Sequence, residues 1–422
     1  MRGKKTIVLL GTFDTKAQEF LYAKNLIEKE HFAVLSVDVG TGARGRLLFP
    51  PDFSREEVAR AAGTTLEEIL ALGKAGQEIR IIELMAEGAV RICRSLHDEG
   101  RLDGVLSLGG TMGTNLGTKV MRGLPFGVPK VMLSTVASGD TAPYVATTDI
   151  VMIPSIADIA GLNRITEVTL TQAASAIMGM AAAAKPSSSN RPLVGITTLG
   201  GTTNCALQAK SRLEARGYEV VIFHSNGMGG KAMEEMIAQG LISAVFDLST
   251  NEVVDHLYQG WSDSGPTRME EAGRRGIPQL IAPGNIDHII YSSPEKIPER
   301  FRKQHVHVHA QGINVLRTKK NEMIEVARCM ADKINRASGE AAVLVPLKGL
   351  SVLDLVEKEF DDPEANAAFT RTLKEHLKPG VEVKEVDVHV TETSFGDVGA
   401  EMLIRLIEQA EGGAPAASGL PG

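Results

Sequence analysis

The sequence predicts an α/β protein made of two tandem Rossmann-like lobes, each a mainly parallel sheet covered by helices. Three observations predict this fold class. Short apolar, β-branched runs alternate with helical segments, which is typical of a parallel sheet covered on both faces. Two of the early runs end in glycine-rich turns that lead into a helical pattern. The opening segment of the chain is echoed after residue 192, which indicates a repeated βαβ-type lobe.

The length and a break in composition predict the domain organisation. With 422 residues the chain exceeds one ordinary hydrophobic core, so we expect two domains. Residues 185–192 (KPSSSNRP) have the composition of a linker. It would join a nucleotide-binding lobe over residues 1–184 to a second α/β lobe over residues 193–410. Residues 411–422 read as a disordered tail.

Charge and cysteine usage exclude several classes of protein. The net charge is −7 and 4% of residues are aromatic, with no basic stripe, so we expect no nucleic-acid partner. The three cysteines are scattered without CxxC spacing, which favours a reducing, cytoplasmic location. The longest apolar run, Ala173–Ala184, is too short to span a bilayer and reads as a buried helix. We therefore expect no membrane partner.

The strands are expected where short apolar runs occur. In the first lobe they are Thr6–Leu10, Val34–Val39, Gly104–Leu108 and Lys130–Ser134; in the second they are Leu193–Thr197, Glu219–His224, Ala244–Leu248 and Gln279–Ala282. Helices are expected over Thr15–Glu30 and Cys205–Arg216, the first opened by a capping box of Thr15 and Gln18. Residues 49–100 read as charged and helical. Right-handed crossovers place the strand-end turns of a lobe along one sheet edge, where open α/β sheets bind ligands.

The first glycine-rich turn, GTFDTK, offers backbone donors at the start of a helix, as phosphate sites do. It lacks the glycines of a dinucleotide fingerprint and the closing triplet of a Walker A motif. Lys16 would offset phosphate charge and Asp14 would bind Mg²⁺. The alternative is an ordinary strand-to-helix turn in which Asp14 or Thr15 caps the helix. The candidate ligand residues of this turn are Gly11, Thr12, Asp14, Thr15 and Lys16.

The second turn, GGTMGTN, carries a stronger signal because three glycines would let a ligand approach the backbone closely. Close packing of the helix on the sheet explains one of these glycines well and three poorly. The candidate phosphate-binding residues here are Gly109, Gly110, Thr111, Gly113 and Thr114.

Two further strand ends supply candidates at the same edge. Asp38 ends the second strand, where an acid takes ribose hydroxyls in doubly wound nucleotide binders, and Arg44 could reach phosphates. A solvated acidic turn is the equal alternative. After the fourth strand come Thr135, Ser138 and Asp140, suited to hydrogen bonds with base, ribose or substrate. Asp140 is the second candidate for Mg²⁺. Ser138 lacks the GxSxG setting of a hydrolase nucleophile.

In the second lobe we expect Lys231, Asp287 and His288 to meet a second ligand, such as a small carboxylate. The run HVHVHA places His305, His307 and His309 on one face of a strand. Three imidazoles can hold a metal, but alternation with valine is equally typical of a half-exposed strand. We therefore leave the three histidines out of the predicted site.

The motifs GTFDTK, DVGTG, GGTMGTNLGTKVMRGLPFGVPKVMLSTVASGDTAPYV, TDIVMIPSIADIAGLNRI, FHSNGMGGKAMEEMI and RGIPQLIAPGNIDH resemble the Tm-1-like ATP-binding family, UPF0261. The resemblance covers about Lys4 to Leu406. It implies two Rossmann-like subdomains, ATP on the first, and self-association into a homodimer or higher homo-oligomer. The histidine-rich run is a departure from that family.

The expected function is ATP binding in the first lobe, with Mg²⁺, and a possible ATP-dependent reaction of a small carboxylated metabolite. Two alternatives stay open: a non-catalytic module that responds to ATP, and a nucleotide-independent enzyme of acyl or sugar-acid metabolism. The sequence names no acid–base pair, because that requires geometry.

Overall fold

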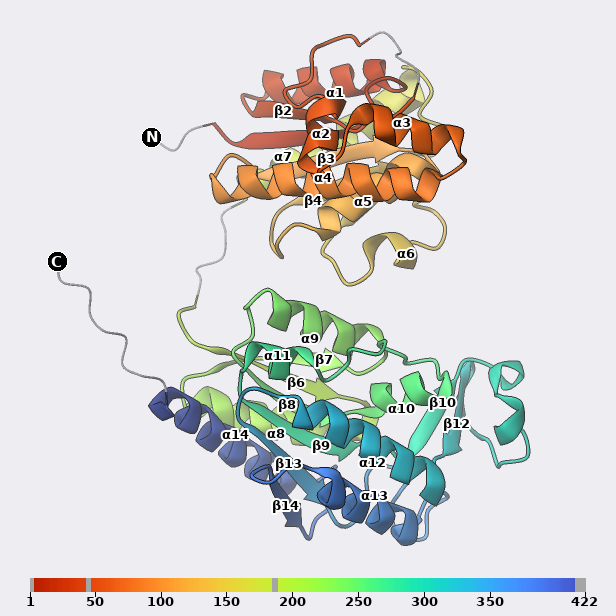
Figure 1. Cartoon of the computed structure of the whole chain (residues 1–422), viewed down its shortest axis with the longest axis vertical. Coiled ribbons are helices and arrows are strands. Elements are labelled where there is room, and N and C mark those ends of the chain that lie inside the picture. Colours follow the sequence, from red (N-terminus) through yellow and green to blue (C-terminus); the bar gives the residue numbers. More distant parts are fainter. Residues whose placement is uncertain (1–3, 43–46, 184–188, 414–422) are drawn as a thin grey trace, which may run out of the picture. The chain divides into compact units, whose positions relative to one another are not determined.

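A computed structural model describes residues 4–42, 47–183 and 189–413 (Figure 1). The chain divides into two compact units, Met1–Ser187 and Ser188–Gly422, and each is described by itself. Arg44, residue 184 of the first lobe and residues 185–188 of the expected linker lie outside the described residues, as do residues 414–422 of the expected tail.

The first unit is built on a five-stranded sheet in the order β2-β1-β3-β4-β5. Every pair in it is parallel. The strands are β1 (Thr6–Gly11), β2 (Ala33–Asp38), β3 (Gly104–Gly109), β4 (Lys130–Ser134) and β5 (Val151–Pro154). The first four lie where the apolar runs predict them. Because β2 and β3 lie on opposite sides of β1, the chain order reverses between β1 and β3, the point where such sheets bind ligands.

Helices cover both faces of this sheet. Ile7 and Leu9 of β1 pack in one apolar layer, under α1 (Ala17–Lys29) and α7 (Arg164–Ala182). Val8 and Leu10 point to the opposite layer, as the two-residue period of a strand requires. The helices of that layer are α2 (Arg55–Ala61), α3 (Leu66–Lys74), α4 (Glu78–Asp98) and α5 (Thr111–Arg122). Helix α6 (Ala142–Val145) follows β4.

The second unit repeats this topology with one more strand. Its six-stranded sheet has the order β14-β13-β9-β8-β6-β7 and is parallel throughout. The strands are β6 (Leu193–Thr198), β7 (Glu219–His224), β8 (Ala244–Ser249), β9 (Gln279–Gly284), β13 (Ala341–Pro346) and β14 (Glu382–Val386). The order here reverses between β6 and β8. The predicted fold class, two tandem α/β lobes with parallel sheets, is confirmed.

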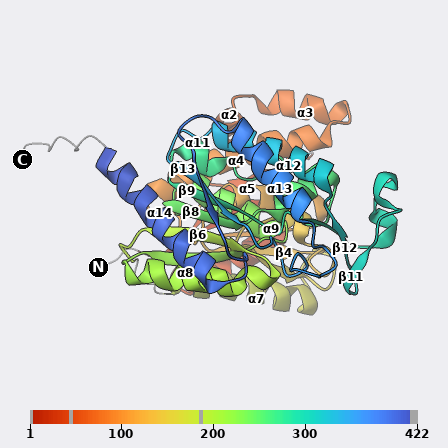
Figure 2. The same ribbon diagram turned by 90° about the horizontal axis from the view of Figure 1, so that it is seen from below.

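The second sheet is also covered on both faces. Helices α8 (Thr203–Ala215) and α14 (Thr393–Gly413) lie side by side on one face (Figure 2). The other face carries α9 (Met228–Ala238), α11 (Glu271–Arg275), α12 (Lys320–Asn335) and α13 (Pro363–His376). After β8 comes α10 (Asn251–Tyr258). A small antiparallel sheet, β10-β12-β11, consists of β10 (His288–Tyr291), β11 (His307–Ala310) and β12 (Ile313–Arg317).

The first helix departs from its predicted start. Thr15 does not cap α1: its hydroxyl lies 2.8 Å from that of Thr12, and Lys16 holds the cap position without a side-chain bond. The predicted capping box of Thr15 and Gln18 is therefore wrong, because the Thr15 hydroxyl pairs with the Thr12 hydroxyl instead. Capping boxes form instead at Ser54 and Thr65, which open α2 and α3. Among the described helices, none combines the length and apolar character needed to cross a bilayer.

Candidate functional site

The carboxyl ends of the first sheet bring the predicted turns to one edge. In the parallel register Gly11 pairs with Asp38 and Gly109 pairs with Ser134. The segments that follow these four residues therefore leave the sheet in the same direction. The turn after β1 and the turn after β3 flank the reversal point of the strand order, where a ligand of this fold class binds.

The turn from β3 into α5 keeps its backbone donors uncapped. Gly110 is the N-cap residue and makes no side-chain cap, and the first bond of the helix runs from the Thr114 N–H to the Gly110 carbonyl at 2.8 Å. The N–H groups of the first helical turn, from Thr111 to Gly113, precede that bond and have no partner within the helix. Thr111 itself is exposed. This end of a twelve-residue helix can accept an anion.

The three glycines of this turn have different physical reasons. A Cβ on Gly109 would lie 2.8 Å from the Gly113 Cα, so packing requires that glycine. On Gly110 the nearest atom would be Thr135 Oγ1 at 3.7 Å, an ordinary contact. On Gly113 it would be the Leu108 carbonyl at 3.6 Å. Packing thus requires one glycine, Gly109, whereas a Cβ on Gly110 or Gly113 would make only ordinary van der Waals contacts.

Thr114 lies beneath this turn and does not face solvent. It is fully buried, and its hydroxyl lies 2.7 Å from that of Ser134. The structure therefore uses Thr114 to join α5 to the end of β4.

In the turn after β1, close packing and hydrogen bonds within the protein occupy several of the residues that were predicted to bind a ligand. A Cβ on Gly11 would lie 2.0 Å from the Phe20 ring, so the glycine makes room for that ring. The Lys16 ammonium donates to the Ile159 carbonyl. The hydroxyls of Thr12 and Thr15 lie 2.8 Å from each other. Thr15 is exposed and Thr12 is half-buried.

The two acids at this edge support a loop. Asp38 is buried, and its Oδ1 accepts from the N–H groups of Phe13 at 3.3 Å and Gly40 at 2.9 Å. Burial raises the pKa of Asp38. Asp14 Oδ2 accepts from the Gly42 N–H at 2.9 Å, while its Oδ1 is buried and finds no partner in the described part of the chain. Asp14 and Asp38 line a cavity of about 260 Å³.

The loop after β4 reaches the same edge. The Thr135 N–H donates to the Gly109 carbonyl at 3.2 Å, and Ser138 is exposed. Asp140 accepts from the Ala142 N–H at 3.1 Å at the start of α6. Within residues 4–42, 47–183 and 189–413, no group of three or more His, Cys, Asp or Glu side chains could hold a metal ion. The Mg²⁺ site at Asp14 or Asp140 therefore stays a prediction.

In the second unit the structure brings two of the three predicted residues together. Asp287 is fully buried, and its Oδ1 lies 3.2 Å from His288 Nδ1 while its Oδ2 accepts from the Ser351 hydroxyl at 2.6 Å. Burial alone would raise the pKa of Asp287, but His288 and the Arg317 guanidinium outweigh it and lower that pKa. His288 lines a cavity of about 320 Å³ whereas Lys231, exposed on α9, does not.

The histidine-rich run forms one edge of the small antiparallel sheet. His305 and His307 both contact the carboxylate of Glu359. His309 is exposed on β11 and lines the 320 Å³ cavity.

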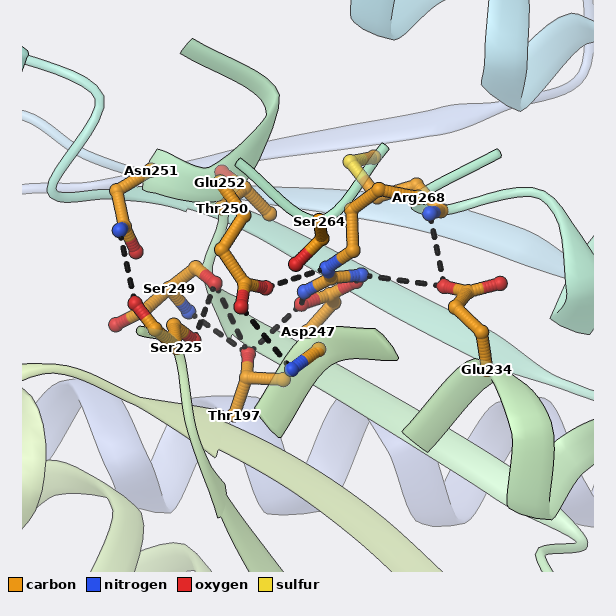
Figure 3. Close-up of polar contacts among 12 residues, drawn as sticks. Thr197, Ser225, Glu234, Asp247, Ser249, Thr250, Asn251, Glu252, Ser264 and Arg268 are labelled. Atoms are coloured by element: carbon orange, nitrogen blue, oxygen red, sulfur yellow. Dashed lines mark hydrogen bonds and ion pairs between the residues drawn. The ribbon is translucent and has the colours of Figure 1, made fainter. Parts of the chain in front are cut away.

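A buried ion cluster, which sequence reasoning missed, lies near the carboxyl end of β8 (Figure 3). Arg268 is 1% exposed and donates to both oxygens of Asp247, each at 2.5 Å. Its Nε donates to Glu252 at 2.6 Å, and Glu234 lies at 3.3 Å from Nη1. Glu252 also accepts from the N–H of Gly227 at 2.8 Å. The signal in the sequence was a single acid, Asp247, inside the apolar run AVFDLS.

The cluster joins elements that are distant in sequence. Arg268 stands in the segment between α10 and α11, while its partners come from α9, β8 and α10. Burial raises the pKa of Glu234 despite the nearby guanidinium. Since all of its groups are engaged with one another, we regard this cluster as a support for the strand ends.

These features define a class: a two-unit α/β protein in which each unit is a doubly wound parallel sheet covered by helices. Residues 5–186 match the N-terminal domain of the uncharacterised protein family UPF0261, and residues 191–407 match the C-terminal domain of that family. The chain belongs to the UPF0261 family.

Relatives span nearly the whole chain. A UPF0261 protein of Clostridium tetani is 38% identical over 407 residues, which is 96% of this chain and 100% of that protein. The ToMV resistance protein Tm-1(GCR237) of Solanum lycopersicum is 36% identical over 324 residues, which is 75% of this chain and 43% of the tomato protein. The predicted family resemblance is confirmed.

Solved structures match only loosely. A putative UDP-N-acetylglucosamine 2-epimerase from Listeria monocytogenes aligns with 66% of this chain and 79% of its own, at a TM-score of 0.23 and 12% identity. The glycosyltransferase SnogD from Streptomyces nogalater aligns with 96% of this chain and 100% of its own, at a TM-score of 0.22 and 11% identity. At such scores the likeness carries no argument about function.

Proposed function

We propose that the first unit binds ATP at the carboxyl ends of β1 and β3, with a phosphate group at the start of α5. The observation that carries the proposal is the uncapped N-terminus of α5, next to the reversal of the strand order. Unpaired N–H groups and the positive end of the helix dipole attract an anion there. Gly110 leaves room for that anion, because a Cβ on it would make only one contact, at 3.7 Å.

Outward-facing hydroxyls extend this anion site. Thr12 and Thr15 stand on the turn after β1, and Thr111 and Ser138 on the two neighbouring turns. Hydroxyl groups donate hydrogen bonds to phosphate and to ribose oxygens. The resemblance to an ATP-binding family makes ATP, with Mg²⁺ held at Asp14 or Asp140, the nucleotide of choice.

Two predicted ligand residues, Lys16 and Asp38, already form hydrogen bonds within the protein, which makes them less suited to contact a nucleotide. Lys16 would have to exchange its bond with the Ile159 carbonyl for a phosphate, and Asp38 would have to release two backbone N–H groups for a ribose. We therefore assign the phosphate to the α5 start and to hydroxyl groups. This phosphate site would serve either of two functions: nucleotide binding without turnover, or an ATP-dependent reaction of a small carboxylated metabolite.

The test is a thermal-shift screen with ATP–Mg²⁺, NAD, coenzyme A and a panel of organic acids. At a hundredfold excess over its dissociation constant, ATP should stabilise the protein by about 2.7 kcal/mol. In Gly110→Val the added side chain occupies the approach to the helix start, so the shift should disappear. Hydrolysis of ATP, measured with each acid present, then separates an enzyme from a binding module.

The matched control is Gly179→Val on α7, where a Cβ would meet nothing within 4 Å. It should keep the full ATP response. An unchanged ATP response in Gly110→Val would show that the phosphates lie elsewhere. A response to organic acids with none to ATP would favour the nucleotide-independent enzyme instead.

Two expectations accompany this proposal. The reducing environment indicated by the cysteines places the protein in the cytoplasm, and the family resemblance implies a homodimer or a larger homo-oligomer. Light scattering after size-exclusion chromatography measures that oligomeric state directly.

A further inference from the structure

The second unit carries a cavity at the edge that corresponds to the proposed nucleotide edge of the first. The cavity has a volume of about 320 Å³ and is lined by segments that follow β6, β7, β9 and β13. Residues of β10 and β12 close it from the small antiparallel sheet. Such a volume lies at the lower end of the range for small-molecule sites.

Asn285 presents an unpartnered acceptor to this cavity. The residue is only 4% exposed, and its Nδ2 donates to Ser249 Oγ at 3.0 Å and to the Leu199 carbonyl at 3.3 Å. These bonds direct the amide nitrogen away, and Oδ1 has no hydrogen-bond partner among the described residues. The Asn285 N–H donates to the Leu350 carbonyl at 2.8 Å, which holds the residue at a φ of 62°.

His288 presents a second unpartnered hydrogen-bond acceptor to the cavity. The residue is 6% exposed and lines the cavity, with Nδ1 directed at the Asp287 carboxylate. The Asp287 carboxylate lies within hydrogen-bond distance of Nδ1, at 3.2 Å, which favours the tautomer that carries its proton on Nδ1. The Nε2 lone pair is then left without a partner in the described part of the chain. That nitrogen can accept a hydrogen bond from a molecule in the cavity.

The lining decides the chemical class of the ligand. It holds histidine, asparagine, serine and apolar residues, and includes no Lys, Arg, Asp or Glu. A charged ligand would lose its hydration there without a counter-charge. Two acceptors call for hydroxyl or N–H donors. Trp261, 55% exposed on the lining, offers a flat apolar face for the C–H groups of such a molecule.

We propose that this cavity binds a small, uncharged polyhydroxylated molecule, a polyol or monosaccharide, whose hydroxyl groups donate to Asn285 Oδ1 and to Nε2 of His288. Asp287 is a positioning residue that fixes the tautomer of the imidazole. The site is separate from the proposed nucleotide site, so the two proposals succeed or fail independently.

The chain itself supplies the reporter for a test, because Trp261 is its single tryptophan. We would titrate the intact protein with glycerol, myo-inositol, D-ribose and D-glucose and follow tryptophan fluorescence. D-gluconate and glucose 6-phosphate serve as charged counterparts. At least one neutral compound should give a saturable change, at tenfold or more lower concentration than its charged counterpart. No saturable change with any neutral compound, or equal binding of the charged ones, would overturn the assignment.

Variants test the role of His288 and the location of the site in this cavity. His288→Asn keeps an amide donor toward Asp287 but removes the atom that faces the cavity, and should weaken binding at least tenfold. Val352→Phe fills the cavity from a residue that is 41% exposed, so it should abolish binding without disturbing the fold. The control is His256→Asn, an exposed histidine paired with Asp263 outside the lining. Circular dichroism of each variant verifies folding. Unweakened binding in both cavity variants would contradict the proposal.

Discussion

At the scale of single residues, the most exacting requirement lies in the buried charges of the second unit. One guanidinium, that of Arg268, faces the carboxylates of Asp247, Glu252 and Glu234 (Figure 3). Its bidentate bond with Asp247 and its bond with Glu252 compensate part of the cost of removing these charges from water. The arrangement is therefore intolerant of losing its single cation.

We predict that Arg268→Met destabilises the protein by about 3–5 kcal/mol at pH 8, because it leaves buried carboxylates uncompensated. Without the cation these carboxylates would hold protons more tightly in the folded state than in the unfolded chain. The folded state would then bind more protons, so the loss should shrink as the pH falls toward 5. Denaturant unfolding at both pH values measures it.

The control for this prediction is Arg274→Met. The Arg274 side chain is 59% exposed and pairs with Glu271 at the surface. An exposed pair contributes only about 0–1 kcal/mol, so the change should be small at either pH. Equal losses in the two variants would mean that the buried cluster has no special role in stability.

At the scale of elements, the glycines in the turns after β1 and β3 are required for different physical reasons. Gly11 ends β1 directly beneath the Phe20 ring of α1. Gly110 opens α5, and a Cβ on it would have no contact closer than 3.7 Å. The two residues look alike in the sequence, since each follows an apolar strand. The distinction arises from the neighbouring helix, because α1 places an aromatic ring over its turn.

We predict that Gly11→Ala destabilises the first unit by about 1–3 kcal/mol, because the new Cβ overlaps the Phe20 ring and forces α1 to shift. Gly110→Ala should change stability by less than about 0.5 kcal/mol, as surface substitutions do. Thermal unfolding followed by circular dichroism compares them. The double variant Gly11→Ala, Phe20→Leu should recover part of the loss. If Gly11→Ala were neutral, the close packing of α1 on β1 would be in error.

At the scale of the whole molecule, one topology is used twice. Both sheets are parallel, and both reverse their strand order next to the first strand of the unit. The apolar layers of the first unit are built from its own helices and strands, and so are those of the second. Each unit therefore has the covered sheet that an independent domain requires.

We predict that residues 4–183 and 189–413 fold when produced as separate proteins. Each should show a cooperative thermal transition by circular dichroism and dispersed amide signals by NMR, because each retains both layers of its own core. The fragments should also divide the ligands, ATP stabilising the first and a polyol binding the second. A fragment that is unfolded alone would show that its core depends on the rest of the chain.

Much of the fold was predictable because its signals are local. A covered parallel strand is a short apolar run, and eight such runs coincide with β1 to β4 and β6 to β9, within one or two residues at each end. The strands β5, β13 and β14 escaped prediction, as did β10 and β12 of the small antiparallel sheet, whereas β11 lies in the histidine-rich run that was expected on a strand. Strand β14, with sequence EVKEV, is largely polar and half exposed, so it lacks the apolar signature of its neighbours.

By itself, the sequence determined the fold class, the repeat and the sheet edge to which the polar turns of each unit lead, because these follow from periodicity and from the order of strands and turns. Tertiary structure decided which polar groups are free. Lys16 is engaged by Ile159, 143 residues further on, and Arg268 by Asp247, 21 residues before it. Hydrogen-bond partners are chosen by proximity in space, which spacing along the chain does not encode. This is why Asn285 stands out only in the folded protein, and why Gly110 and His288 are separated from the other predicted residues only there.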